Sequence, residues 1–252
     1  MTDTILRAEH LTKTFISGKK ALTAVDDTSF ELEQGECLGI VGESGSGKST
    51  IAKMITHLES ITEGRVILKG KDITHVKGKE LREIYQDMQM VFQMPMESFD
   101  PRCRLGDGIG ESLRNMGISR AETRRKVEEL LERCGLEKEY ADRYPHQVSG
   151  GQCQRAAIAR ALAVNPSILI CDEATSALDV TVQKQILELL IELKQKENLS
   201  FIFICHDLAL VQAFCDRVIV LYRGKTVESG TPDEIIEHPK MDYTRKLIDS
   251  VL

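Results

Sequence analysis

A glycine-rich segment at residues 42–50, GESGSGKST, carries the residue types that bind nucleotide phosphates. It fits the pattern G-x-x-x-x-G-K-[ST] and follows a short apolar run, which is the context of a phosphate-binding loop between a strand and a helix. Backbone N–H groups of such a loop surround phosphate oxygens, and Lys48 would neutralise charge on the β and γ oxygens. Ser49 is the expected Mg²⁺ ligand, and Thr50 the expected support of the α-phosphate. The expected ligands of the nucleotide here are Gly42, Glu43, Ser44, Gly45, Ser46, Gly47, Lys48, Ser49 and Thr50.

A second segment, VSGGQ at 148–152, places a serine and two glycines directly before a run with the composition of a helix. That run stops at Asn165 and Pro166. Free backbone N–H groups and the positive end of the helix dipole at such a start also suit a phosphate. In isolation, the same five residues also fit a capped helix start without a ligand. The chain therefore contains two candidate phosphate sites.

Two acidic side chains and a histidine follow apolar runs of strand length. ILICDE places Asp172 at the end of a buried strand, where it can hold Mg²⁺ through water, and Glu173 follows where an attacking water would lie. We expect Asp172 to serve the metal and Glu173 to orient the water or take its proton. His206 follows the apolar run FIFIC and is expected to keep Glu173 and the water in line. Taken alone, an acidic pair also starts ordinary loops, and a lone histidine is more often structural.

Length and composition predict a folded globular chain. Of its 252 residues, 42% are hydrophobic and 29% are charged, which allows ample core. The longest apolar stretches, at 201–205 and 218–222, fall far short of the roughly 20 residues that a membrane span needs. The N-terminus has no signal-peptide pattern, and the net charge of -6 argues against nucleic acid as the main partner. We expect a chain that stays in the cytoplasm.

The cysteines indicate neither disulfides nor a metal site. Seven are scattered at positions 37, 103, 134, 153, 171, 205 and 215, without CxxC or Cys/His ligand spacing. Several lie in apolar runs, so buried reduced thiols are expected.

Strand-like and helix-like segments alternate along the chain, without internal repeats. This alternation predicts an α/β fold with buried strands, a charged helical insert, a hairpin and a helical tail after Pro232. The expected strands are 35–41, 167–173 and 200–207, the helices are 49–58 and 183–196, the charged helical section of the insert is about 112–135, and the hairpin is 218–230.

Taken together, these motifs resemble the full set of an ATP-binding cassette (ABC) ATPase, in that family's order. The set comprises the loop at 42–50, Gln93 in MVFQM, VSGGQ, ILICDE, SALD at 176–179 and His206. The resemblance covers essentially the whole chain and implies one ABC ATPase domain over 1–252. Its P-loop NTPase core has a parallel sheet with a small N-terminal antiparallel β region, and a helical subdomain is inserted in it. The implied limits are 1–93 and 159–230 for the core, about 94–158 for the helical subdomain and 231–252 for the tail.

The resemblance also implies roles for residues that no motif explains by itself. Phe15 in LTKTF matches the aromatic that stacks on adenine, with Val25 nearby, and Gln93 is expected to touch Mg²⁺ or the water. In the family, VSGGQ of one subunit closes over the γ-phosphate held by the loop of another, so each chain owns half of two ATP sites. This signature comprises Ser149, Gly150, Gly151 and Gln152, and the D-loop comprises Ser176, Ala177, Leu178 and Asp179.

The connecting segments are similar to ATPases of bacterial importers for oligopeptides, dipeptides and nickel. They include 90–102, 144–155, 172–187 and 238–248. Two departures are Cys153, where arginine is common, and an end at Leu252 without the longer cysteine-bearing extension of many peptide-importer ATPases. We expect the first to leave catalysis intact, so that arginine is tolerated there. The second removes the case for an iron-sulfur cluster and favours the shorter nickel or metal-chelate members.

The same resemblance implies the cofactors and partners. These are ATP, Mg²⁺, a second ABC ATPase subunit in a homo- or heterodimer, two permease subunits and, indirectly, an extracytoplasmic substrate-binding protein. The chain would lie on the cytoplasmic face of the cell membrane. Four methionines surround Gln93, and they either fill core or line a groove for a permease helix. They are Met88, Met90, Met94 and Met96.

Two other classes of protein compete with an importer subunit. A non-transport ABC ATPase would act as an assembly or scaffold factor, but such proteins tend to carry a coiled-coil insert, tandem cassettes or a changed loop after the glutamine. A P-loop kinase would not explain VSGGQ, SALD and His206 together.

Overall fold

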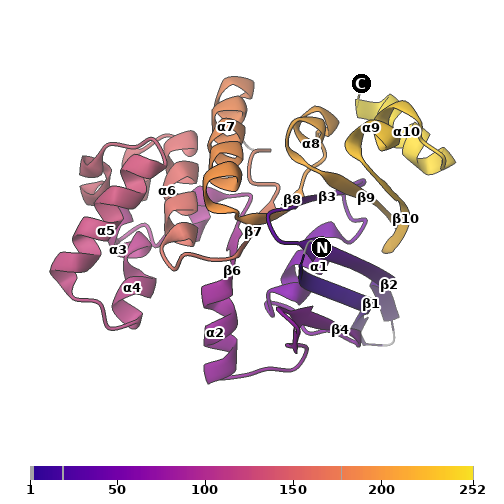
Figure 1. Cartoon of the computed structure of the whole chain (residues 1–252), viewed down its shortest axis with the longest axis horizontal. Helices are drawn as coiled ribbons and strands as arrows, with labels where there is room; N and C mark the ends of the chain where they lie inside the picture. The colour runs from indigo at the N-terminus through magenta and orange to yellow at the C-terminus, as the bar shows by residue number, and fades with distance from the viewer. Residues whose placement is uncertain (1–2, 19, 177, 252) are drawn as a thin grey trace.

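The computed structural model describes residues 3–18, 20–176 and 178–251, and it contains two β-sheets with helices around them (Figure 1). The smaller sheet is antiparallel, with strand order β2-β1-β4-β5. It consists of β1 (Thr4–Ser17), β2 (Lys20–Glu33), β4 (Glu63–Leu68) and β5 (Lys71–Asp72). The expected small N-terminal antiparallel region is therefore confirmed.

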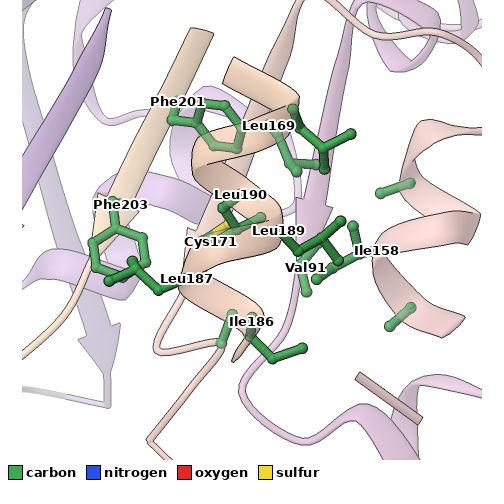
Figure 2. Packing of buried hydrophobic residues seen from close by; sticks show 14 of the residues in the cluster. Val91, Ile158, Leu169, Cys171, Ile186, Leu187, Leu189, Leu190, Phe201 and Phe203 are labelled. Carbon is green, nitrogen blue, oxygen red and sulfur yellow. The ribbon is translucent and has the colours of Figure 1, made fainter. Parts of the chain in front are cut away.

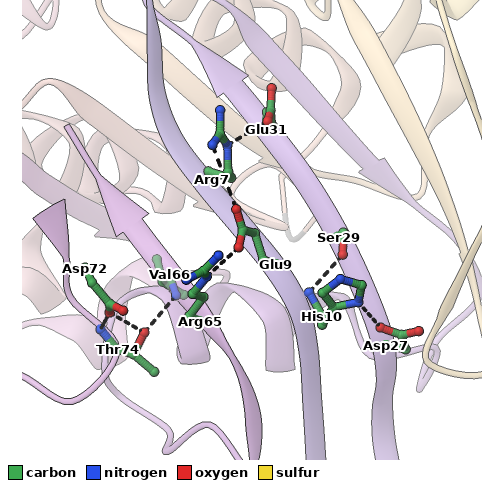
Figure 3. A network of polar contacts seen from close by, with 10 residues as sticks. All are labelled: Arg7, Glu9, His10, Asp27, Ser29, Glu31, Arg65, Val66, Asp72 and Thr74. Atoms are coloured by element: carbon green, nitrogen blue, oxygen red, sulfur yellow. Dashed lines mark hydrogen bonds and ion pairs between the residues drawn. The ribbon is translucent and has the colours of Figure 1, made fainter. Parts of the chain in front are cut away.

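Polar side chains form ion pairs and hydrogen bonds between neighbouring strands of this smaller sheet (Figure 3). Arg7 on β1 pairs with Glu31 on β2 at 2.6 Å, and the ring of His10 lies 2.6 Å from a carboxylate oxygen of Asp27. These pairs are exposed, so each contributes little to stability. Their main effect is to favour one register of the strands, because a shift by one residue would move every side chain to the other face.

The larger sheet has the strand order β10-β9-β3-β8-β7-β6. All neighbouring pairs are parallel except β9 and β10, which form the expected hairpin. Its strands are β3 (Cys37–Val41), β6 (Met88–Val91), β7 (Ile168–Asp172), β8 (Ser200–Ile204), β9 (Arg217–Tyr222) and β10 (Lys225–Gly230). Because β3, β7 and β8 are adjacent and parallel, the loops that follow them meet at one edge of the sheet.

The two faces of the larger sheet bury two separate cores. Successive residues of a strand point to opposite faces, so continuous apolar runs suit strands that are covered on both sides. One core contains Val41, Leu169, Cys171, Phe201 and Phe203 together with residues of α5, α6, α7 and α8. Figure 2 shows the part of this core where Leu169, Cys171, Phe201 and Phe203 lie near α7. The other contains Leu38, Ile40, Ile170, Ile202 and Ile204 together with residues of α1 and the smaller sheet.

Helices cover both faces of the larger sheet. Those of the core and tail are α1 (Lys48–Ile55), α2 (Lys79–Asp87), α7 (Val180–Glu197), α8 (Leu208–Phe214), α9 (Pro232–Glu237) and α10 (Asp242–Val251). Figure 1 shows α7 and α8 on the side of the larger sheet opposite to α1. None of the helices within the described ranges is long and apolar enough to cross a membrane.

The insert contains several helices that pack on one another. They are α3 (Leu105–Ile109), α4 (Glu111–Asn115), α5 (Arg120–Arg133) and α6 (Gly150–Leu162), with short 3₁₀ helices at Pro95–Ser98, Lys138–Asp142 and Pro145–Gln147. The section at about 112–135 is helical, as expected, and Gly117, with φ 85°, separates α4 from α5. Ser119 then caps α5 by accepting a hydrogen bond from the N–H of Glu122. The limits of the subdomain at about 94–158 stay a prediction.

Candidate active site

The loop at 42–50 connects β3 to α1, which is the context that the sequence predicted. Its final glycine, Gly47, has φ 110° and lies so close to β2 that a Cβ atom there would overlap the carbonyl oxygen of Ala24. Only glycine combines this backbone conformation with this approach. The hairpin turn supports the loop from the other side, because the N–H of Gly224 donates to the Ser46 carbonyl at 2.9 Å. The loop is thus held between two distant segments.

Lys48 lies inside the curve of the loop. Its Nζ donates to the carbonyl oxygens of Gly42 at 2.7 Å and Glu43 at 2.8 Å, and its side chain is buried. Burial lowers the pKa of Lys48, although the nearby carboxylates of Glu173 and Asp172 oppose that change. A partly desolvated ammonium group beside the backbone N–H groups of the loop favours the binding of an anion.

Asp172 and Ser49 bring two oxygen donors together from different segments. The Ser49 hydroxyl donates to Asp172 Oδ1 at 2.8 Å. Burial raises the pKa of Asp172, while the hydrogen bond from Ser49 acts in the opposite direction. Within the described ranges, no group of three His, Cys, Asp or Glu side chains is placed to hold a metal. A hydroxyl and one carboxylate fit Mg²⁺ only together with phosphate oxygens, which is how this ion is usually bound.

Glu173 has a left-handed backbone, with φ 49°, which is uncommon for a residue other than glycine. Its N–H donates to the Ile204 carbonyl at 3.0 Å, so the residue is fixed to the end of β8. Its own carbonyl accepts from the Ser176 hydroxyl at 3.0 Å, and Ser176 Oγ in turn accepts from Gln93 Nε2 at 3.1 Å. Hydrogen bonds therefore connect Gln93 to the strained turn of Glu173.

A pocket of about 320 Å³ lies where these segments meet. Most of its lining residues were expected from the sequence. The pocket is lined by Ala24, Ser44, Gly45, Gly47, Lys48, Ser49, Thr50, Gln93 and Glu173. Ala24 is the residue that sequence reasoning missed, because an alanine on a long strand carries no local signal of a site.

Several expected site residues do not line this pocket; they include Gly42, Glu43, Ser46 and Asp172 as well as Phe15, Val25 and His206. Val25 is fully buried and lies under Gly47, so its side chain supports the loop and offers no surface to a ligand in this structure. Phe15 is 39% exposed on β1, and the Lys13 ammonium lies 4.9 Å from its ring centre. His206 is exposed directly after β8, at the edge of the sheet where Asp172 also ends its strand.

The signature segment forms the start of α6, away from the pocket at 42–50. Ser149 caps the helix by accepting from the N–H of Gln152, and Gln152 Oε1 accepts from the N–H of Ser149 at 2.9 Å. The next residues pack on the start of α7, because a Cβ atom at Gly151 would overlap the Val182 side chain. Within the described D-loop, Leu178 lies near Gly150 and Asp179 caps α7, whereas Ala177 lies outside the described residues.

The methionines around Gln93 divide into two groups. Met88 on β6 is buried, and Met90 on the same strand is partly buried against the same core, so core filling explains both. Met94 and Met96 are 50% and 38% exposed, and Phe92 beside them is 37% exposed. Exposed apolar side chains next to a site residue are compatible with contact to another protein.

The cysteines are reduced, and Cys103 is the exposed one while the remaining six are buried. Burial raises the pKa of Cys153 to about 11. Its side chain is fully enclosed among core residues, so a larger residue at this position would have to displace its neighbours. The expectation that arginine leaves hydrolysis intact stays a prediction.

We expect Cys153→Arg to destabilise the protein by about 2–4 kcal/mol, because a larger and charged side chain must enter a filled core. The melting temperature should then fall by roughly 5–10 °C in a thermal unfolding experiment. Cys153→Ala is the matched control and should lose about 1 kcal/mol, because it removes only the sulfur. Equal melting temperatures for the arginine variant and the wild type would contradict this prediction.

The site geometry agrees with comparisons to known proteins. Residues 25–176 match the ABC transporter family. The chain is 44% identical over its whole length to the oligopeptide transport ATP-binding protein OppF of Bacillus subtilis (strain 168), covering 83% of that protein. It is 43% identical over 98% of its length to the dipeptide transport ATP-binding protein DppF of Lactococcus lactis subsp. cremoris (strain MG1363), covering 81% of that protein.

Solved structures give the same result. The dimeric post-hydrolysis state of the ATP-binding cassette MJ0796, bound to ADP and Pi, superimposes with a TM-score of 0.83 at 32% identity. The match covers 90% of this chain and 98% of the MJ0796 chain. CbiO1 from Clostridium perfringens, part of the ABC transporter complex cbiONQ, has the same TM-score at 28% identity. That match covers 94% of this chain and 92% of the CbiO1 chain. Since the family model matches residues 25–176 and relatives above 40% identity are covered over more than four fifths of their length, the chain belongs to the ABC transporter family as an ATP-hydrolysing member.

Proposed function

We propose that the pocket at 42–50 binds ATP with Mg²⁺ and is the site of hydrolysis. The observation that carries this proposal is that Lys48, Ser49 and Glu173 line one pocket, with Asp172 hydrogen-bonded to Ser49. Lys48 and the loop N–H groups hold the phosphates, while Ser49 and Asp172 hold the metal, which neutralises phosphate charge when bound. Glu173 orients the attacking water or accepts its proton, and Gln93 keeps the turn of Glu173 in place.

Phe15 and His206 keep the roles that the family resemblance implies for them. Phe15 would stack on the adenine and His206 would sense the γ-phosphate, and both side chains are exposed enough to meet a ligand. A role for Val25 is restricted to supporting Gly47, because its side chain is buried.

We further propose that the signature at 149–152 acts on the nucleotide of a second ABC ATPase subunit. No signature residue lines the pocket of its own chain, and the related MJ0796 cassette is dimeric. A triphosphate between two sets of N–H donors would hold two subunits together, and hydrolysis would remove that link. The partner is either a second copy of this chain or a different cassette.

The transport role that we propose is energising an importer for peptides. Relatives that match over most of their length are named for oligopeptide and dipeptide transport, so we prefer peptides to the nickel complexes that the short tail had favoured. In this role the chain lies on the cytoplasmic face of the membrane with two permease subunits, and a substrate-binding protein delivers the cargo outside. The competing function is a scaffold or assembly factor without cargo.

Uptake by cells that lack this chain tests the transport role. We expect a labelled tripeptide to enter such cells more slowly, with recovery after expression of the wild type but not of Glu173→Gln. Labelled nickel provides the parallel measurement. Loss of nickel uptake with normal peptide uptake would show that peptides are not the cargo. Normal uptake of both would favour the scaffold function.

A further inference from the structure

The C-terminal helical tail reaches the phosphate-binding loop. The hydroxyl of Tyr243, in the first turn of α10, accepts a hydrogen bond from the backbone N–H of Glu43 at 3.1 Å. The Tyr243 ring packs on the ring of Tyr222 at the end of β9, with 4.0 Å between ring centres. The two partners in the hydrogen bond are 200 residues apart in the sequence, so only the tertiary structure brings them together.

The start of α10 is fixed to the hairpin by a buried carboxylate. Glu228 on β10 accepts hydrogen bonds from the backbone N–H groups of Lys240 at 2.8 Å and Met241 at 3.1 Å, and from the Thr244 hydroxyl at 2.5 Å. Glu228 is 9% exposed and Thr244 is fully buried. Hydrogen bonds to an ionised carboxylate are strong, and three of them fix both the helix start and the neighbouring Tyr243. Figure 1 shows α9 and α10 side by side near this hairpin.

Tyr243 and Lys48 act on the same peptide group. The Gly42–Glu43 peptide donates its N–H to Tyr243, and its carbonyl, that of Gly42, accepts from Lys48 Nζ at 2.7 Å. A hydrogen bond at one end of a peptide polarises the group and strengthens the bond at its other end. Both bonds together therefore define the orientation of this peptide and the resting position of the Lys48 ammonium.

We propose that Tyr243 is a positioning residue for nucleotide binding, which pre-orders the first peptide of the phosphate-binding loop from the C-terminal tail. This inference rests on the proposed nucleotide site. Without the hydroxyl, the Gly42–Glu43 peptide can rotate, and part of the binding free energy is then used to order it. Binding of the nucleotide is weakened, whereas the groups that act on the attacking water keep their positions.

Tyr243→Phe tests the proposal because it removes only the hydroxyl and keeps the stacked ring. We expect ATP affinity, measured with a fluorescent ATP analogue, to fall about fivefold, the factor that corresponds to one hydrogen bond of about 1 kcal/mol. The KM for ATP should rise by the same factor, and kcat should stay within about twofold. Tyr222→Phe is the matched control and should leave both constants unchanged, because the Tyr222 hydroxyl makes no hydrogen bond within the described part of the chain.

A second variant acts on the anchor of the tail. Glu228→Gln keeps the size of the side chain but removes the charge that holds three donors, so it should weaken ATP binding in the same direction as Tyr243→Phe. Wild-type ATP affinity in Tyr243→Phe would overturn the proposal, even if its melting temperature fell. Lys48→Ala separates this result from failure of the nucleotide site itself, because unchanged ATP affinity in Lys48→Ala would show that the site is misassigned.

Discussion

Glu173→Gln is expected to lower ATP turnover by about a hundredfold or more, while ATP affinity stays within about threefold of the wild type. Lys48, Ser49 and the loop N–H groups remain in place, so the phosphates keep their partners. The amide is nearly the same size as the carboxylate, but it carries no negative charge to orient the water or to take its proton. Steady-state phosphate release and equilibrium binding of an ATP analogue measure the two quantities separately.

This variant is also expected to accumulate as a closed dimer with ATP, because the step that ends closure is blocked. Size-exclusion chromatography with and without ATP detects that species. Glu83→Gln on α2 is the matched control, since it removes one exposed carboxylate on an element that contributes nothing to the pocket. Near-normal hydrolysis by Glu173→Gln would show that Glu173 has a different role.

Ser149→Arg is expected to reduce hydrolysis by about a hundredfold while ATP still binds to the phosphate-binding loop of the same chain. Arginine places bulk at the start of α6, where two subunits must meet around one γ-phosphate. The closed arrangement supplies the N–H donors and excludes water, so hydrolysis stops when closure is prevented. Binding of an ATP analogue and phosphate release again provide the two measurements.

Ser149→Ala is the control for loss of the helix cap. It removes the hydroxyl that accepts from Gln152, so it should cost about 1 kcal/mol of stability without adding bulk. If the arginine variant lost ATP binding as an isolated chain, the signature would belong to the chain's own site and the shared-site proposal would fail.

Mixing two variants identifies the partner subunit. A dimer of one Ser149→Arg chain and one Lys48→Ala chain has one site with both substitutions and one site with neither. Hydrolysis that returns on mixing therefore supports a homodimer. No return on mixing, with activity restored by a second cassette protein, supports a heterodimer.

Local sequence determined the elements and the centre of the site. The phosphate-binding loop is contiguous, so its glycines, Lys48 and Ser49 could be recognised from spacing alone. Continuous apolar runs identified β3, β7 and β8, and these strands then brought Asp172 and Glu173 to the loop because the ends of parallel strands meet at one edge. Helix caps such as Ser149 depend on bonds between residues three apart, which a sequence displays directly.

Only the tertiary structure decided which distant residues support that centre. Ala24 lines the pocket and Val25 lies beneath it because β2 passes over Gly47, a contact that neither residue type signals. The burial of Cys153 follows from the packing of α6 in the insert, so a comparison of residue types at that position did not reveal that the side chain is enclosed. Tyr243 meets Glu43 because three hydrogen bonds to Glu228 fix the tail on the hairpin. Contacts of this kind depend on how whole elements pack, and packing is set by the chain as a whole rather than by any short segment of it.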